Sequence, residues 1–235
     1  MADITPPLAA ATSLPDTAGR PRVRVWDLPT RVFHWSLLGC VAGAVYSAEV
    51  GGNWMEWHLR FGAAALGLLA FRIVWGFAGP RYARFRSFLY APSAVFAHLK
   101  KLGSAERHAG HSPSGAASVF ALLGVLVAQS VSGLFSSDSI ATDGALVRYV
   151  SEASVSLATS VHVKLQWVLY ALVGLHVVAV LAYLLVKRDN LIGPMLHGDK
   201  AALHAPHAAD SMAVRAAGLA LIGGTVAAAV WLFGG

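Results

Sequence analysis

The sequence predicts an all-α membrane protein: a bundle of four transmembrane helices, followed by a fifth, C-terminal transmembrane helix. Three observations predict this fold class. Of the 235 residues, 56% are hydrophobic and 13% are charged, about half the charged fraction of a typical soluble domain. The apolar residues are gathered into five stretches, each long enough to cross a bilayer. The basic residues are gathered between those stretches, where they set membrane orientation.

The predicted spans cover, in order, residues 30–48, 54–77, 115–135, 160–186 and 212–233. The first span ends at a short polar patch that reverses the chain, and the second ends at Gly79 and Pro80. A long basic segment follows the second span, and a polar, mildly acidic loop follows the third. These connecting segments are residues 49–53, 81–111 and 136–159.

We therefore divide the chain into four parts: a tail of residues 1–21, a four-helix core of residues 22–190, a linker of residues 191–210, and the fifth span within residues 211–235. The tail is rich in Ala, Pro and Thr and lacks the basic start and apolar stretch of a signal peptide, so we expect it to be disordered. The linker carries no span of its own, so we expect it to be mobile.

The placement of Lys and Arg predicts the orientation of the chain. Of the 18 basic residues, 14 precede the first span, follow the second or follow the fourth, whereas the opposite loops carry only Arg148. The positive-inside rule puts the N-terminus in the cytoplasm. The same placement argues against nucleic acid as a partner, despite the net charge of +6.

The single cysteine, Cys40, lies inside an apolar stretch. It excludes an internal disulfide framework, a thiolate-ligated iron–sulfur cluster and a Cys-x-x-Cys-His haem attachment site.

Four of the ten histidines lie in or at the edges of spans: His34, His58, His162 and His176. An ionisable residue inside a membrane is costly, so each is a functional candidate. The last two share the fourth span at a spacing of 14 residues, which places them on one face of a helix about 21 Å apart.

Depth along the spans pairs these histidines. His34 and His176 lie toward the cytoplasmic side, and His58 and His162 lie near the periplasmic side. Two axial imidazoles make a six-coordinate, electron-transferring haem. The sequence therefore predicts two b-type haems, one near each face of the membrane.

Two alternatives compete with this interpretation. The histidines could be polar packing residues bonded to neighbouring helices, which is less consistent with four at matched depths. A metal transporter would prefer carboxylates near the histidines, and the spans lack acidic residues at mid-depth. Of the remaining histidines, only His111 adjoins a span; we expect the others to be solvated.

Three cations lie within spans: Arg60 and Lys164 near the periplasmic side, and Arg72 near the cytoplasmic side. Haem propionates need cations, so we expect these residues to bind them. Snorkelling to lipid head groups is the alternative for the two arginines. Small residues on the spans would let helices or a flat macrocycle approach closely; they are Gly39, Gly43, Gly62, Gly67, Gly133 and Gly174.

Together these segments resemble the bacterial cytochrome b561 family, which shares its haem core with the b subunits of nickel–iron hydrogenases and formate dehydrogenases. The resemblance covers about residues 22–190. The segments that carry it are residues 25–35 (VWDLPTRVFHW), 58–62 (HLRFG), 72–76 (RIVWG), 79–85 (GPRYARF), 111–115 (HSPSG), 132–135 (SGLF) and the His162/His176 pair.

The resemblance implies two non-covalent b haems, with the same four histidines as ligands and the same pairing. It also implies a bacterial inner-membrane protein that exchanges electrons with ubiquinone or menaquinone. Two features depart from the family pattern. Pro113 is followed by Ser114 instead of an apolar residue, which weakens a quinone-site role there, and the chain continues beyond Leu191.

Several functions stay open. The chain could carry electrons between the quinone pool and a periplasmic c-type cytochrome, anchor a hydrogenase or dehydrogenase, or act alone as a superoxide:quinone oxidoreductase. A scaffold or transporter without haem belongs to another class. We expect no residue to act as acid, base or nucleophile, because the haem carries the redox chemistry. A homodimer is left open.

Overall fold

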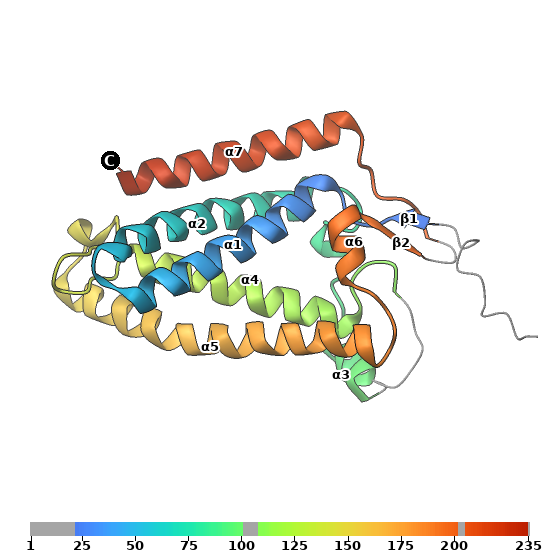
Figure 1. Cartoon of the computed structure of the whole chain (residues 1–235), viewed down its shortest axis with the longest axis horizontal. Helices are drawn as coiled ribbons and strands as arrows, with labels where there is room; N and C mark the ends of the chain where they lie inside the picture. The colour runs from blue at the N-terminus through green and yellow to red at the C-terminus, as the bar shows by residue number, and fades with distance from the viewer. Residues whose placement is uncertain (1–21, 101–107, 202–204, 235) are drawn as a thin grey trace, which may run out of the picture.

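The computed structural model describes residues 22–100, 108–201 and 205–234, and the predicted tail, residues 1–21, lies outside them. Five long helices dominate the described part (Figure 1): α1 (Leu28–Val50), α2 (Met55–Ala78), α4 (Pro113–Leu134), α5 (Glu152–Leu185) and α7 (Met212–Gly234). This confirms the predicted helical bundle with a further C-terminal helix. The shorter elements are α3 (Pro92–Lys100), α6 (Ile192–His197), β1 (Arg22–Arg24), β2 (Asp199–Ala201) and three 3-10 turns.

Among the described residues, four helical segments are long and apolar enough to cross a membrane: Gly52–Ala78, Pro113–Leu134, Glu152–Leu185 and Met212–Phe233. The protein is therefore a multi-pass membrane protein. Helix α1 is also 23 residues long, but it is not among these segments. It carries Arg31, His34 and Glu49, which lower its mean hydropathy.

Helix α2 is the centre of the bundle. Helices α1 and α2 pack as one antiparallel pair, α4 and α5 pack as a second, and α2 contacts α4 where the two pairs meet. The main core includes Phe33, Leu68, Phe71, Trp75 and Leu126. In contrast, Leu169 is the only residue of α5 buried in this chain. The outward faces are apolar, as expected where lipid is the solvent.

Side chains at the helix starts explain where the helices begin. Asp27 accepts a hydrogen bond from the Thr30 backbone N–H and caps α1, and Ser112 caps α4 in the same way through Gly115. Each cap satisfies a backbone donor that the helix leaves unpaired. Gly51 joins α1 to the next turn with φ of 69°, a conformation that favours glycine.

Helix α5 begins earlier in the chain than the sequence predicts. Its 34 residues start at Glu152, eight residues before the predicted span, because Ser151 caps the helix and Glu152 lies in its first turn. The predicted loop of residues 136–159 is therefore shorter by about two helical turns.

The linker of residues 191–210, which we expected to be mobile, is instead structured in its described residues. It forms α6 and β2, and β2 pairs antiparallel with β1, with Arg22 opposite Ala201. Arg24 reaches Asp199 at 2.7 Å and Asp210 at 2.8 Å. We call this end of the bundle the strand end, and the opposite end, which carries the α4–α5 connection, the loop end (Figure 1).

Helix α7 lies against α2 and α1, on the side away from α5 (Figure 1). The contact with α2 is close: a Cβ built on Gly67 would lie 2.5 Å from the Val226 Cα and 2.7 Å from the Thr225 carbonyl oxygen. Glycine at this position therefore lets the two backbones approach, as is common between membrane helices.

Candidate haem-binding site

The structure brings His58 of α2 and His162 of α5 together at the loop end. Their ring centres are 6.1 Å apart and their planes are nearly perpendicular, at 87°. Two imidazoles on opposite faces of one iron would have ring centres roughly 6 Å apart, because each metal–nitrogen bond is about 2 Å long and each nitrogen lies about 1 Å from its ring centre. The spacing of this pair therefore suits axial ligation of one haem iron.

The hydrogen bonds of this pair fix its tautomers. His58 Nδ1 lies 2.9 Å from the Ala44 carbonyl oxygen of α1, and His162 Nδ1 lies 2.9 Å from the Gln129 carbonyl oxygen of α4. A carbonyl can only accept, so each Nδ1 carries the proton and each Nε2 keeps its lone pair. This is the usual arrangement of a metal-binding histidine, in which the non-ligating nitrogen is held by a carbonyl or carboxylate.

Helix α4 supports His162 with two further residues. Ser132 Oγ lies 3.2 Å from His162 Nδ1, and the Gln129 side-chain amide donates to His162 Nε2 at 3.2 Å. A Cβ on Gly133 would lie 3.0 Å from His162 Cε1, so glycine makes room for the imidazole. Sequence reasoning gave no role to Gln129, although a polar side chain inside a span is itself a functional signal.

His34 and His176 approach each other nearer the strand end. His34 lies six residues after the start of α1, and His176 lies nine residues before the end of α5. The two side chains are close enough to interact electrostatically. His34 Nδ1 is buried and has no hydrogen-bond partner. A buried nitrogen without a partner is costly, so His34 suits a ligand inside the bundle.

The two pairs share one helix. His162 and His176 both belong to the continuous helix α5, about 21 Å apart along its axis. Within residues 22–100, 108–201 and 205–234, no group of three or more His, Cys, Asp or Glu residues could hold a bare metal ion. Two imidazoles per site instead match haem, which supplies four ring nitrogens of its own. The residues present therefore fit two haems.

The three predicted cations have different surroundings. Arg72 is buried, at 4% exposure, and its Nη1 has no hydrogen-bond partner. Arg60 is exposed, pairs with Glu56 one turn away and lies over the Trp57 ring. Lys164 is also exposed. Of the three cations, therefore, only Arg72 is buried inside the protein with an unpaired nitrogen.

The six predicted small residues also differ. Gly43 accommodates the Phe61 ring, Gly67 the backbone of α7, and Gly133 the His162 imidazole. A Cβ on any of the others would meet nothing within 4 Å; they are Gly39, Gly62 and Gly174.

Comparison with known protein families gives a match. The family model described as prokaryotic cytochrome b561 matches residues 25–198. That range contains all four histidines and ends before α7. No curated protein and no solved structure matches the chain.

Proposed function

The chain belongs to the prokaryotic cytochrome b561 family, and we propose that it is a di-haem cytochrome of the bacterial inner membrane that carries electrons between the quinone pool and a periplasmic c-type cytochrome. Membership of the family makes it a membrane b-type cytochrome that functions in electron transfer. The observation that carries the finer proposal is the presence of two histidine pairs at different depths on one helix, α5.

The strand end faces the cytoplasm in this proposal. Of the 18 basic residues, eleven lie in described segments at the strand end or next to it, whereas Arg148 is the only one in the α4–α5 connection. The eleven are Arg22, Arg24, Arg31, Arg81, Arg84, Arg86, Lys100, Lys187, Arg188, Lys200 and Arg215. The positive-inside rule relates such segments to the cytoplasm. His34 and His176 then hold an inner haem, and His58 and His162 hold an outer haem.

The chain's own residues hold and orient these groups, and each haem, when bound, supplies one-electron redox chemistry. The carbonyl groups of Ala44 and Gln129 keep the protons of His58 and His162 on Nδ1. Each Nε2 is thereby the unprotonated nitrogen that could bind the outer iron, and for His162 that bond would replace the contact with the Gln129 side-chain amide, at 3.2 Å. The apolar helices exclude water from the space between the ligands.

Among the cations, Arg72 is the proposed partner of a haem propionate on the cytoplasmic side. Its buried guanidinium has an unpaired donor at Nη1, and a charge-assisted bond to a carboxylate would satisfy it. Arg60 and Lys164 could bind propionates of the outer haem, but the exposure of both and the Arg60–Glu56 pair favour head-group contacts instead.

The loop end offers an acidic surface to a periplasmic partner. The segment 136–159 carries Asp138, Asp143 and Glu152 against the single cation Arg148. Such a surface would steer a basic partner toward the outer haem. A stably bound hydrogenase or dehydrogenase subunit is the second candidate partner that the family supports, and superoxide as a direct electron donor is the third.

Asp143 offers a test of the docking surface, because it is exposed in this loop. We expect Asp143→Lys to slow electron transfer to a basic c-type cytochrome at low salt. The difference should disappear at about 1 M salt, where the Debye length is about 3 Å. An unchanged rate at low salt would exclude this surface. Copurification of a dehydrogenase with the chain would favour the anchor function.

The ligand assignment is tested by His34→Ala and His58→Ala, made separately. Each variant should lose one haem and keep the other, because the two sites use different residues. His197→Ala is the control, since His197 is an exposed histidine of α6. A variant that keeps both haems would contradict the pairing. Quinol-dependent reduction of the remaining haem would then identify the haem that receives electrons from quinol.

A further inference from the structure

Arg72 and His111 form a buried cluster at the strand end. His111 lies just before α4, and its Nδ1, like Arg72 Nη1, is buried without a hydrogen-bond partner. The Phe88 ring connects them: its centre is 4.2 Å from the His111 ring and 6.0 Å from the Arg72 guanidinium carbon. Two polar side chains in contact with the same ring thus each carry a buried nitrogen without a hydrogen-bond partner.

The cluster carries one positive charge that no carboxylate neutralises directly. Burial and the nearby Arg72 charge lower the pKa of His111 to about 3, so the imidazole is neutral at physiological pH. Asp27 acts on Arg72 through space, but its oxygens accept hydrogen bonds from Thr30 and Trp75. Among the described residues, Arg72 forms no ion pair. A buried unpaired charge is costly, so the cluster favours an anion.

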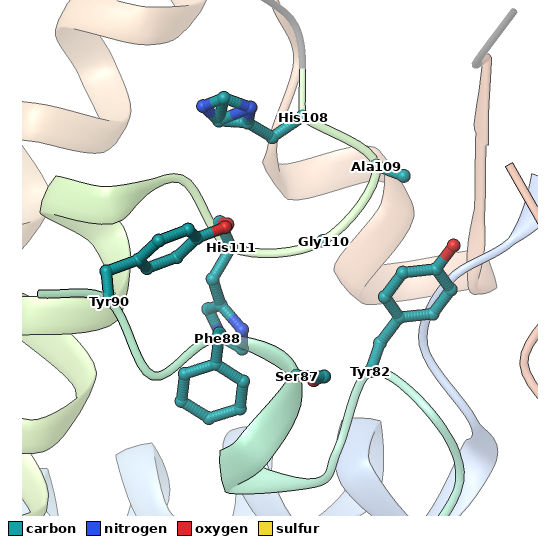
Figure 2. A pocket seen from close by; sticks show the side chains of 8 residues that line it. All are labelled: Tyr82, Ser87, Phe88, Tyr90, His108, Ala109, Gly110 and His111. Atoms are coloured by element: carbon teal, nitrogen blue, oxygen red, sulfur yellow. The ribbon is translucent and has the colours of Figure 1, made fainter. Parts of the chain in front are cut away.

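The surrounding residues hold the cluster in place. The Phe85 ring lies 4.7 Å from the Arg72 guanidinium carbon, and Gly76, one turn after Arg72, makes room for that ring because a Cβ there would collide with it. Trp26 also contacts the His111 ring, edge to face, with ring centres 4.8 Å apart. Figure 2 shows the His111 imidazole beside the Phe88 ring, in the wall of a cavity of about 290 Å³.

The position of Arg72 in the bundle indicates which group could supply the anion. The rings of Phe33 and Phe71 are in contact, at 5.9 Å, where α1 and α2 face each other. Because the helices are antiparallel, the next residue of each, His34 and Arg72, points to the same side of the pair. His176 lies on that side as well, since it interacts with His34. Arg72 therefore shares the depth and the side of the proposed inner haem.

We propose that Arg72 and His111 together bind a carboxylate of the inner haem, with His111 as a second hydrogen-bond donor beside the guanidinium. This inference rests on the proposed function. The two donors position the haem and offset the carboxylate's negative charge, which would otherwise favour the oxidised iron. His111 is thus a positioning residue that raises the reduction potential of one haem.

The test is a redox titration of the purified full-length protein and its variants, in which the inner haem is identified as the one missing from His34→Ala. His111→Leu removes the donor, whereas His111→Asn keeps an N–H near the position of Nδ1. We expect His111→Leu to raise the ratio of oxidised to reduced inner haem by about three- to tenfold at a fixed potential. This is less than the roughly 13- to 160-fold that a whole hydrogen bond to a charged group is worth, because the donor binds the carboxylate in both oxidation states. The Asn variant should stay near the wild type, and the outer haem should not change.

The outcomes separate this inference from the proposed function. An equal shift in the Leu and Asn variants, or no shift in either, would overturn the role of His111. A Leu variant that keeps only its outer haem supports the role if the Asn variant keeps both. A wild-type potential that depends on added phosphate would mean that the cluster binds a soluble anion. Absence of b-type haem from the wild type would instead refute the proposed function itself.

Discussion

Substitution of Gly133 by alanine should weaken binding of the outer haem. The new Cβ would lie 3.0 Å from His162 Cε1 and 3.3 Å from His162 Nδ1, whereas carbon atoms at optimal contact are about 3.5–4.0 Å apart. The imidazole would have to retreat by roughly 0.5–1 Å, and metal–ligand distances tolerate only about 0.2 Å. The hydrogen bond to Gln129, at 2.9 Å, opposes the same movement.

The expected magnitude follows from the cost of overpacking. Extra methyl groups in a packed interior cost about 1–3 kcal/mol. At about 1.4 kcal/mol per tenfold, this weakens the affinity for the outer haem by about five- to 150-fold. The inner haem, which uses other residues, should keep its affinity.

The assay is haem titration of the apoprotein in detergent, followed by difference spectroscopy, with the outer haem identified as the one missing from His58→Ala. Gly124→Ala is the matched control, because Gly124 lies on the same helix and a Cβ there meets nothing within 4 Å. Both substitutions gain similar helix propensity, so the difference between them isolates the contact with His162. Equal outer-haem affinity in both variants would refute the reasoning.

Two further predictions concern parts of the fold outside the histidines. Gly67→Ala should weaken the packing of α7 against α2 by about 1–3 kcal/mol, because the new Cβ would lie 2.5 Å from the Val226 Cα. Gly62→Ala is the control, because Gly62 is also on α2 and a Cβ there would meet nothing within 4 Å. Cysteine crosslinking between α2 and α7 measures the difference between the two variants. Asp210 is stabilised as a carboxylate: burial raises its pKa, but the hydrogen bonds from Arg215 and the Leu28 N–H, with the nearby arginine charges, outweigh burial and lower it. A lowered pKa stabilises the fold above the pH at which the unfolded group ionises, about 4, and that stabilisation is lost as the pH falls through the folded pKa. Asp210→Asn should therefore speed hydrogen exchange in β1 and β2 at pH 7 by roughly five- to 30-fold, and the effect should shrink as the pH falls below about 4. An effect that stays the same as the pH falls through the acid range would contradict the role of the charge.

The long helices were predictable because each is rich in apolar residues, although Arg31, His34 and Glu49 make α1 less apolar than the other four. The fixed rise of a helix gives each histidine a depth in the bundle, and this was enough to predict that His58 and His162 lie at the same depth. Short turns between the helices leave few other ways to pair the four histidines. Ser151 followed by Glu152 is a sequence pattern that indicates the start of α5. The predicted span began later, at residue 160, because the first two turns of the helix are less apolar than a membrane span.

The strand end was not predictable from local patterns. Strands β1 and β2 are three residues each and are separated by almost the whole described chain. Their pairing depends on contacts such as Arg24 with Asp199 and Asp210, which no periodicity indicates. The sequence also could not predict that Arg72 is unpaired, because it shows that a cation lies in a span but not which side chains surround it.

The supports of the ligands were partly visible. Gln129 could have been found as a polar residue within a span, but its contact with His162 joins α4 to α5 and depends on how these helices pack. The roles of the glycines differ for the same reason: Gly133 faces an imidazole and Gly62 faces open space, although both are simply glycines on apolar helices in the sequence.

The most direct test of the central claim is a reduced-minus-oxidised spectrum of the purified protein, with haem quantified per chain. The proposed ligand pairs predict a b-type spectrum and two non-covalent haems per chain, falling to one in His34→Ala and in His58→Ala and to none in the double variant. A wild-type protein without a b-type signal would contradict the claim, and so would a double variant that retains haem.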